Sequence, residues 1–182
     1  MSKTLVKLVD SAIFPASLLI VSKVLGLVLT NNIFGLNWGI DHQIQQFQLF
    51  SVQIVYIDQQ SSVIAATYSN IIMYLVIFIG FAVRIFQARF LHNDHISPRL
   101  LTKLAENNLL SILKSSFDIY LEGSIWLVFS WIAWFIVFVH YLLSLNSLTL
   151  CLVILVIQIL STTVFFRQLN REFEESKKNL KL

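Results

Sequence analysis

The stretch IWLVFSWIAWFIVFVHYLLSLNSLTLCLVILVIQILSTTVFF, residues 125–166, decides the fold of this chain. It contains no Lys, Arg, Asp or Glu in 42 residues. A helix needs about 20 mostly apolar residues to cross a bilayer, so this stretch is long enough for two crossings. Its most polar point lies at Asn146, which separates apolar runs over 125–145 and 148–166. We therefore predict two transmembrane helices joined by a tight antiparallel turn.

The composition extends this interpretation to the whole chain. The 182 residues are 57% hydrophobic and 13% charged, against roughly 45–50% and about 25% in soluble globular chains. The mean hydropathy is +0.75. A soluble protein of this length could not bury so much apolar surface in one core. We predict an all-α integral membrane protein whose main partner is the lipid bilayer.

Two further apolar runs precede the opening stretch. With them, the chain has four predicted transmembrane helices, at about 12–36, 65–86, 125–145 and 148–166. Each run has room for the roughly 17–25 residues that a tilted helix needs. We expect them to form a single helical domain.

The basic residues orient these four spans. None occurs in residues 24–83 or 115–166. Twelve of the thirteen lie before span one, between spans two and three, or after span four: Lys3, Lys7, Arg84, Arg89, Arg99, Lys103, Lys114, Arg167, Arg171, Lys177, Lys178 and Lys181. Because positive residues stay on the cytoplasmic side, we predict cytoplasmic N- and C-termini and a location in the cell or cytoplasmic membrane. The same pattern accounts for the pI near 9.1 without a nucleic-acid partner.

The connections between spans carry three further predictions. Residues 37–64 form an outer loop rich in Gln and large apolar residues, which we expect to pack on the helix ends, lie in the interface or meet a partner. Its strand or helix content stays open. In residues 97–121, Ser97 and Pro98 precede apolar residues spaced by three and four, which predicts an amphipathic inner helix. The charged tail, 167–182, is expected to extend the fourth helix into the cytoplasm.

Lys23 is the one basic residue that departs from the charge pattern. A cation at bilayer depth costs about 2.5–3.5 kcal/mol on insertion scales and usually faces a partner or a cavity. If the first span begins at residue 12, Lys23 lies near the midplane, level with Gln158 of the fourth span. The two side chains would then form an intramembrane polar site, with Ser22 and Ser161 at similar depth.

A second interpretation of Lys23 moves the first span toward the C-terminus. If that span covers 17–36, Lys23 lies about a third of the way in and extends its amine to the inner headgroups. We favour this second interpretation over the polar site.

Three histidines are weaker candidates for a functional site. His140 lies toward the outer end of span three and could titrate near neutral pH, although one structural hydrogen bond or a position at the membrane interface is the favoured interpretation. His92 and His95 flank Asp94 on the cytoplasmic side, where a solvated turn is favoured over a metal or proton site. The single Cys151 forms no Cys/His metal pattern. We predict no catalytic residue, no metal and no cofactor.

Three functions fit these features. The favoured one is a non-catalytic subunit or scaffold of a membrane assembly, with a second copy or other membrane proteins docking on the outer loop and the amphipathic helix. The alternative is a channel or transporter protomer that uses Lys23 and Gln158. An intramembrane enzyme ranks last, because the adjacent Ser22 and Lys23 point about 100° apart on a helix.

Overall fold

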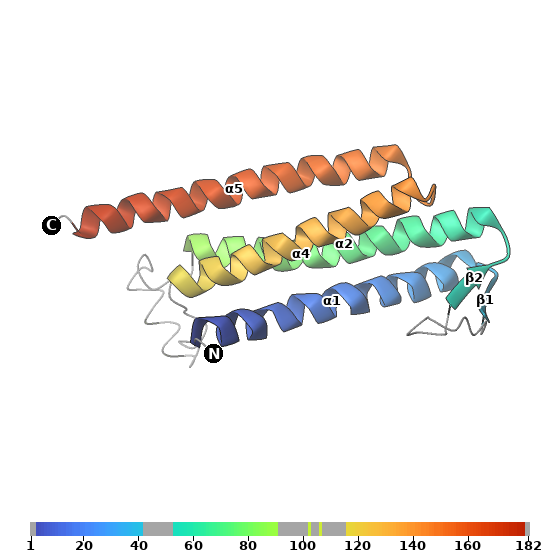
Figure 1. Ribbon diagram of the computed structural model, residues 1–182, viewed down its shortest axis with the longest axis horizontal. Coiled ribbons are helices and arrows are strands. Elements are labelled where there is room, and N and C mark those ends of the chain that lie inside the picture. Colours follow the sequence, from blue (N-terminus) through green and yellow to red (C-terminus); the bar gives the residue numbers. More distant parts are fainter. Residues whose placement is uncertain (1–2, 42–52, 91–101, 103–105, 107–115, 181–182) are drawn as a thin grey trace.

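Four long helices run along one axis in the computed structural model, which describes residues 3–41, 53–90, 102, 106 and 116–180 (Figure 1). The elements are α1 (Lys3–Phe34), β1 (Trp38–Asp41), β2 (Gln53–Tyr56), α2 (Gln59–Phe90), α4 (Ser116–Leu142) and α5 (Leu148–Leu180). All four helices are long and apolar enough to span a membrane. The prediction of a helical bundle with four such helices is therefore confirmed, and these helices suggest a membrane protein.

The helices extend beyond the predicted spans. Helix α2 begins at Gln59 rather than near residue 65, and α4 begins at Ser116 rather than near residue 125. Hydropathy locates the apolar part of a helix, but backbone hydrogen bonding continues into the polar ends. Helix α5 begins at the expected residue and continues to Leu180, so the tail is helical, as expected.

Side chains placed just before two helices explain where those helices begin. Asp58 accepts hydrogen bonds from the Ser61 amide and the Ser61 hydroxyl, both at 2.7 Å. Ser147 accepts a hydrogen bond from the Leu150 amide at 3.2 Å. In each case an N-cap oxygen satisfies a backbone donor that the first helical turn leaves unpaired.

Left-handed residues end α1 and α4. Gly35 has φ of 58°, and the Leu36 amide donates to the Asn31 carbonyl at 3.1 Å. Ser144 has φ of 59°, with the Leu145 amide donating to the His140 carbonyl at 2.8 Å. Both bonds belong to the Schellman motif, which stops a helix by reversing the backbone. The turn around Asn146 follows from this cap.

A short antiparallel hairpin connects α1 to α2. Strand β1 pairs with β2 in a register that places Trp38 opposite Tyr56 and Ile40 opposite Ile54. The Tyr56 hydroxyl donates to Asn31 Oδ1 at 3.0 Å, which attaches the hairpin to the end of α1. The sequence did not decide between strand and helix in this loop, and the structure shows strands at its base. The tip of the loop, 42–52, lies outside the described residues, as does most of the predicted amphipathic helix.

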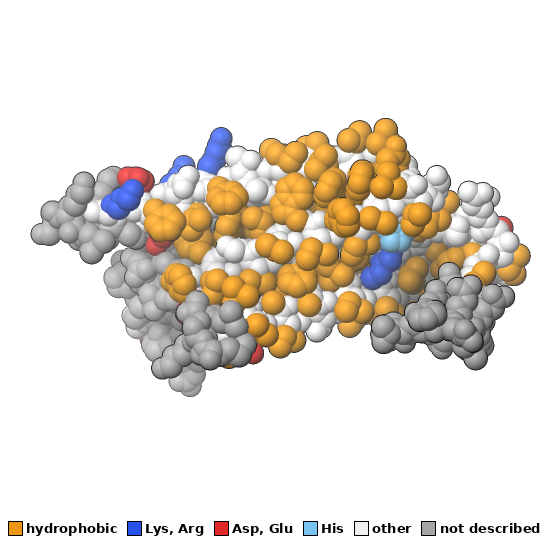
Figure 2. Space-filling model, viewed as in Figure 1, with side chains coloured by type: hydrophobic (Ala, Val, Ile, Leu, Met, Phe, Trp, Pro, Cys, Tyr) orange, Lys and Arg blue, Asp and Glu red, His pale blue; other side chains and the backbone are white. Residues whose placement is uncertain are grey.

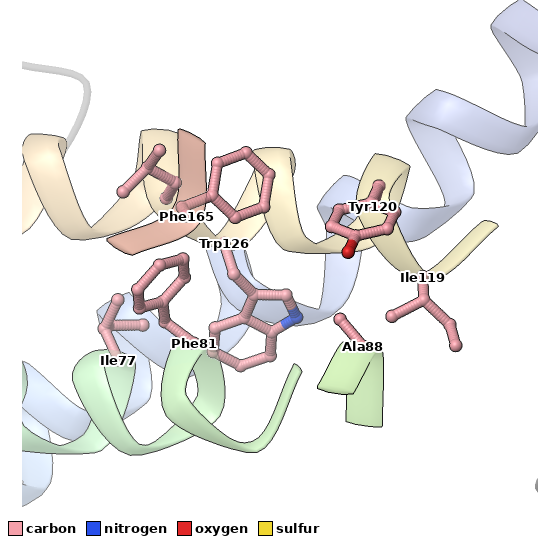
Figure 3. Packing of buried hydrophobic residues seen from close by; sticks show 8 residues of the cluster. Ile77, Phe81, Ala88, Ile119, Tyr120, Trp126 and Phe165 are labelled. Atoms are coloured by element: carbon pink, nitrogen blue, oxygen red, sulfur yellow. The ribbon is translucent and has the colours of Figure 1, made fainter. Parts of the chain in front are cut away.

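Aromatic side chains fill the space between α2, α4 and α5 (Figure 3). Trp126 of α4 is only 4% exposed, and its ring lies against Gly80 of α2. Phe81 packs on Phe165 of α5 at a ring-centroid distance of 6.1 Å. The outward faces of the helices carry large exposed apolar side chains instead, the arrangement expected of helices surrounded by lipid.

Candidate functional site

The helices α1 and α2 approach each other closely at Gly26. A Cβ added there would lie 2.9 Å from Ser69 Cα, so the glycine faces backbone rather than a flexible side chain. Small residues allow helix backbones to come this close in membrane proteins. Because Lys23 lies three residues before Gly26, on a neighbouring part of the helix surface, the close approach brings its side chain to α2.

The Lys23 amine donates two hydrogen bonds to α2. Its Nζ lies 2.8 Å from Ser69 Oγ and 2.5 Å from Asn70 Oδ1. Both acceptor residues are completely buried, while Lys23 itself is half-buried. Ser69 Oγ donates in turn to the Ala66 carbonyl at 3.1 Å. We call Lys23, Ser69 and Asn70 the amine site.

The Lys23 amine has no carboxylate partner among the described residues. No described Asp or Glu lies within 4.0 Å of the Lys23 amine, whereas Lys7 and Arg84 each pair with an acid of α4. The acceptors of Lys23 are a hydroxyl and an amide, which satisfy N–H groups but do not neutralise charge. The second polar atom of Asn70, Nδ2, is buried without a hydrogen-bond partner among the described residues. The site therefore has an N–H donor without a partner, on Asn70, and no negatively charged acceptor among the described residues.

His140 of α4 lies within electrostatic range of Lys23. Figure 2 shows a blue basic side chain beside the pale-blue histidine side chain, surrounded by the apolar side chains of the bundle. The His140 Nδ1 is 2.8 Å from the Ile136 carbonyl of its own helix, the structural hydrogen bond that the sequence analysis favoured. No described Asp or Glu of α4 lies within 4.0 Å of the Lys23 amine.

Gln158 belongs to a different polar cluster. Its Nε2 donates to Ser130 Oγ at 2.6 Å, and its Oε1 accepts from the Tyr74 hydroxyl at 3.2 Å. Gln158 is completely buried. It therefore links α5 to α4 and α2 with both ends of its amide paired, which is a structural role.

The structure does not bring the predicted polar site together. Lys23 and Gln158 have separate partners, and the two serines bond to their own helices. Ser22 Oγ donates to the Leu19 carbonyl at 3.1 Å, and Ser161 Oγ to the Ile157 carbonyl at 2.7 Å. Ser69 and Asn70 were not predicted as site residues, although two consecutive polar residues inside an apolar run were a signal.

The favoured interpretation of Lys23, an amine extended toward the inner end of the bundle, also differs from the observed geometry. The amine is bonded to Asn70, which is 14 residues from Arg84 along α2. At 1.5 Å per residue this is about 21 Å. Lys23 thus lies far from the end of the bundle that carries Lys7 and Arg84.

Two ion pairs at that end were also missed. Lys7 of α1 pairs with Asp118, and Arg84 of α2 pairs with Glu122 at 3.3 Å. Neither pair was predicted from the sequence, in which both acids stand in the first turns of the third apolar helix, where the helix dipole favours them. Both acids follow the basic residues that lie between spans two and three, and this position was the available signal for pairing. His92 and His95 lie outside the described residues.

The described part of the chain offers no metal cluster and two apolar grooves of equal volume, one between α1, α2 and α4 and the other between α2 and α5. No group of three His, Cys, Asp or Glu residues forms a metal site in the described part of the chain. A groove of about 370 Å³ is lined by Phe14, Leu18, Val76, Ile79, Gly80, Val83, Arg84 and Trp126. No protein-family model, curated protein or solved structure matches this chain. The amine site is the feature on which functional inference rests.

Proposed function

We propose that this chain is a four-span integral membrane protein that acts as a non-catalytic subunit or scaffold of a larger membrane assembly. In this proposal the ends that carry Lys7 and Arg84 lie in the cytoplasm, and the β-hairpin lies on the opposite side. The positive-inside pattern of the sequence supports this orientation. The host membrane is the cell or cytoplasmic membrane.

The length of α2 supports the placement across a bilayer. Asp58 and Arg84 are separated by 26 residues, about 39 Å of helix. A bilayer with its headgroup regions is about 40–45 Å thick, so both charges reach polar surroundings. Asn70 lies 12 residues from Asp58, about 18 Å. This depth places the amine site inside the hydrocarbon region.

The observation that supports the proposal is a Lys23 amine with no carboxylate partner among the described residues. A charged side chain at the bilayer centre costs about 2.5–3.5 kcal/mol and is normally paired or directed into a cavity. Lys23 has only neutral acceptors among the described residues and is partly buried beside an apolar helix surface. A neighbouring molecule that covers this surface would supply the charged partner that Lys23 lacks among the described residues.

Purification in a mild detergent tests the proposal. The wild-type protein should elute with co-purifying subunits, as a complex larger than the 20.9 kDa chain in its micelle. A Lys23→Gln variant should dissociate and elute later from a sizing column, as the free chain, because it loses the charge. The matched Lys7→Gln variant, on the same helix, should keep the complex. A monodisperse wild-type monomer without a co-purifying partner would contradict the proposal.

The transport alternative has less support. It required Lys23 and Gln158 to share one site, and the two side chains bond to different partners. It is favoured over the subunit only if proteoliposomes that contain the purified chain alone conduct ions, and if a Lys23→Leu substitution abolishes that flux.

A further inference from the structure

We propose that Lys23 pairs with the carboxylate of an Asp or Glu on a transmembrane helix of a different protein, which packs on the surface of α1 beside the amine site. This inference rests on the proposed function and names the chemistry of the partner. Its basis is the combination of a partly buried amine, two neutral acceptors and the absence of a carboxylate within 4.0 Å among the described residues.

A second copy of this chain cannot supply the carboxylate. The sequence contains no Asp or Glu in residues 11–40, 59–93 and 123–171, which include all four predicted spans. The nearest acid along α2 is Asp58, about 18 Å from Asn70. A copy inserted in the same orientation would place its acids at the two membrane surfaces, level with its own Asp58 or Glu122. The partner is therefore a different chain.

A lipid headgroup also fits poorly. The amine is held on α2 by Ser69 and Asn70, and the same 18 Å separate that position from the outer surface. Lysine side chains reach headgroups from sites near helix ends, whereas Lys23 bonds sideways to the neighbouring helix. A carboxylate at matching depth compensates the charge without moving the amine.

The surface of α1 next to Lys23 is suited to a helix. Ile20 and Val24 are 63% and 53% exposed, and Val21 and Leu25 are exposed beside them. Figure 2 shows the apolar side chains that surround the basic group on this face of the bundle. A helix packed here would make dispersion contacts with these apolar side chains and would bring its acid to the amine. The ion pair would add affinity and would fix the depth of the partner helix relative to α1.

Site-specific photo-crosslinking in native membranes tests this inference. The full-length chain carries p-benzoylphenylalanine in place of Ile20, one turn from Lys23, and the adduct formed under ultraviolet light is identified by mass spectrometry. We expect an adduct with another membrane protein whose crosslinked helix contains Asp or Glu. Lys23→Gln should lower its yield about tenfold, the change that 1.4 kcal/mol of lost pairing produces. Lys7→Gln should leave the yield unchanged, and Lys23→Arg should largely retain it.

Each other outcome overturns the inference in a distinct way. An adduct that Lys23→Gln leaves unchanged would mean that the assembly exists without this ion pair, so the proposed function would stand and the inference would fall. The same holds if the crosslinked helix lacks an acid, or if the adduct joins lipid or a second copy. Absence of any adduct together with a monomeric wild-type protein would contradict both this inference and the proposed function. If Lys23→Gln fails to accumulate, the identity of the wild-type adduct still decides.

Discussion

At the scale of single residues, Gly80 sets the distance between α2 and α4. A Cβ at this position would lie 2.0 Å from Cζ3 of Trp126, a distance that real Cβ contacts essentially never show. Because Trp126 is buried, the ring has little room to move. We expect Gly80→Ala to lower the free energy of unfolding by about 1–3 kcal/mol, the usual cost of overpacking. Thermal unfolding in detergent micelles, followed by circular dichroism, measures it.

Gly39→Ala is the matched control for that substitution. No atom lies within 4 Å of a Cβ built at Gly39, so the variant should unfold near the wild-type temperature. Equal losses in the two variants would show that the effect comes from glycine itself rather than from the contact with Trp126.

The amine site shows how far single residues could be predicted from the sequence. Hydropathy and charge spacing singled out Lys23, because a cation inside an apolar run is visible without a structure. Its partners were not predictable, because the sequence does not give the rotation of one helix against another. The close approach of Gly26 to Ser69, where an added Cβ would lie 2.9 Å from Ser69 Cα, depends on how the helices pack.

At the scale of secondary-structure elements, the ends of α1 and α4 form a natural pair for comparison. Ser144 at φ 59° adopts a conformation that is strained for a residue with a Cβ, whereas Gly35 at φ 58° does not have this strain. Left-handed backbone costs a non-glycine residue roughly 1–2 kcal/mol. Ser144→Gly should therefore raise the unfolding temperature by about 2–4 °C for each kcal/mol gained.

Gly35→Ser is the reciprocal test. No atom lies within 4 Å of a Cβ at Gly35, so steric contact plays no part and the variant should lose stability through the backbone alone. Thermal midpoints of the two variants should move in opposite directions. A shift of the same sign in both would contradict the assignment of these caps.

The N-cap of α2 makes stability depend on pH. The hydrogen bond from the Ser61 hydroxyl, then the one from the Ser61 amide, lowers the pKa of Asp58 below 3.8. A carboxyl whose pKa is lower in the folded state stabilises the fold above its unfolded pKa and loses this contribution as the pH falls through the folded value. Asp58→Ala should therefore lower the thermal midpoint at pH 7, and the difference should shrink below about pH 4.

Asp58→Asn separates the charge from the cap. Asparagine is an equally good N-cap residue and does not titrate. This variant should stay near the wild type at pH 7 and should lack the acid-dependent change that Asp58 contributes. A wild-type midpoint that follows the Asp58→Asn midpoint at every pH would refute the role of the Asp58 carboxylate.

Element boundaries were predictable only where a polar residue interrupts the pattern. Asn146 and its neighbouring serines marked the turn between α4 and α5 correctly, because the apolar runs stop on both sides. The early start of α2 at Gln59 was not visible in hydropathy, since the helix begins with polar residues and is defined by the Asp58 cap. The β-hairpin depends on pairing between residues 12 or more positions apart, which alternation did not reveal.

At the scale of the whole molecule, charge and apolar surface are segregated along the bundle axis. Figure 2 shows charged side chains toward the end where α5 terminates and apolar side chains along the middle. The sequence predicted this division, because the positions of Lys and Arg follow from chain order alone. It did not predict that the Lys7–Asp118 and Arg84–Glu122 pairs would join α4 to α1 and α2, because helix neighbours are decided by packing.

Cysteine labelling in intact cells tests the central claim, that the chain spans the membrane with its termini on the inner side. Cys151 is first replaced with Ser, and a single cysteine is then placed at the exposed positions Asn37 or Asn170. The account predicts that a membrane-impermeant maleimide added outside labels the Asn37→Cys variant in intact cells, and labels Asn170→Cys only after permeabilisation. Labelling of Asn170→Cys in intact cells, or protection of Asn37→Cys, would contradict it.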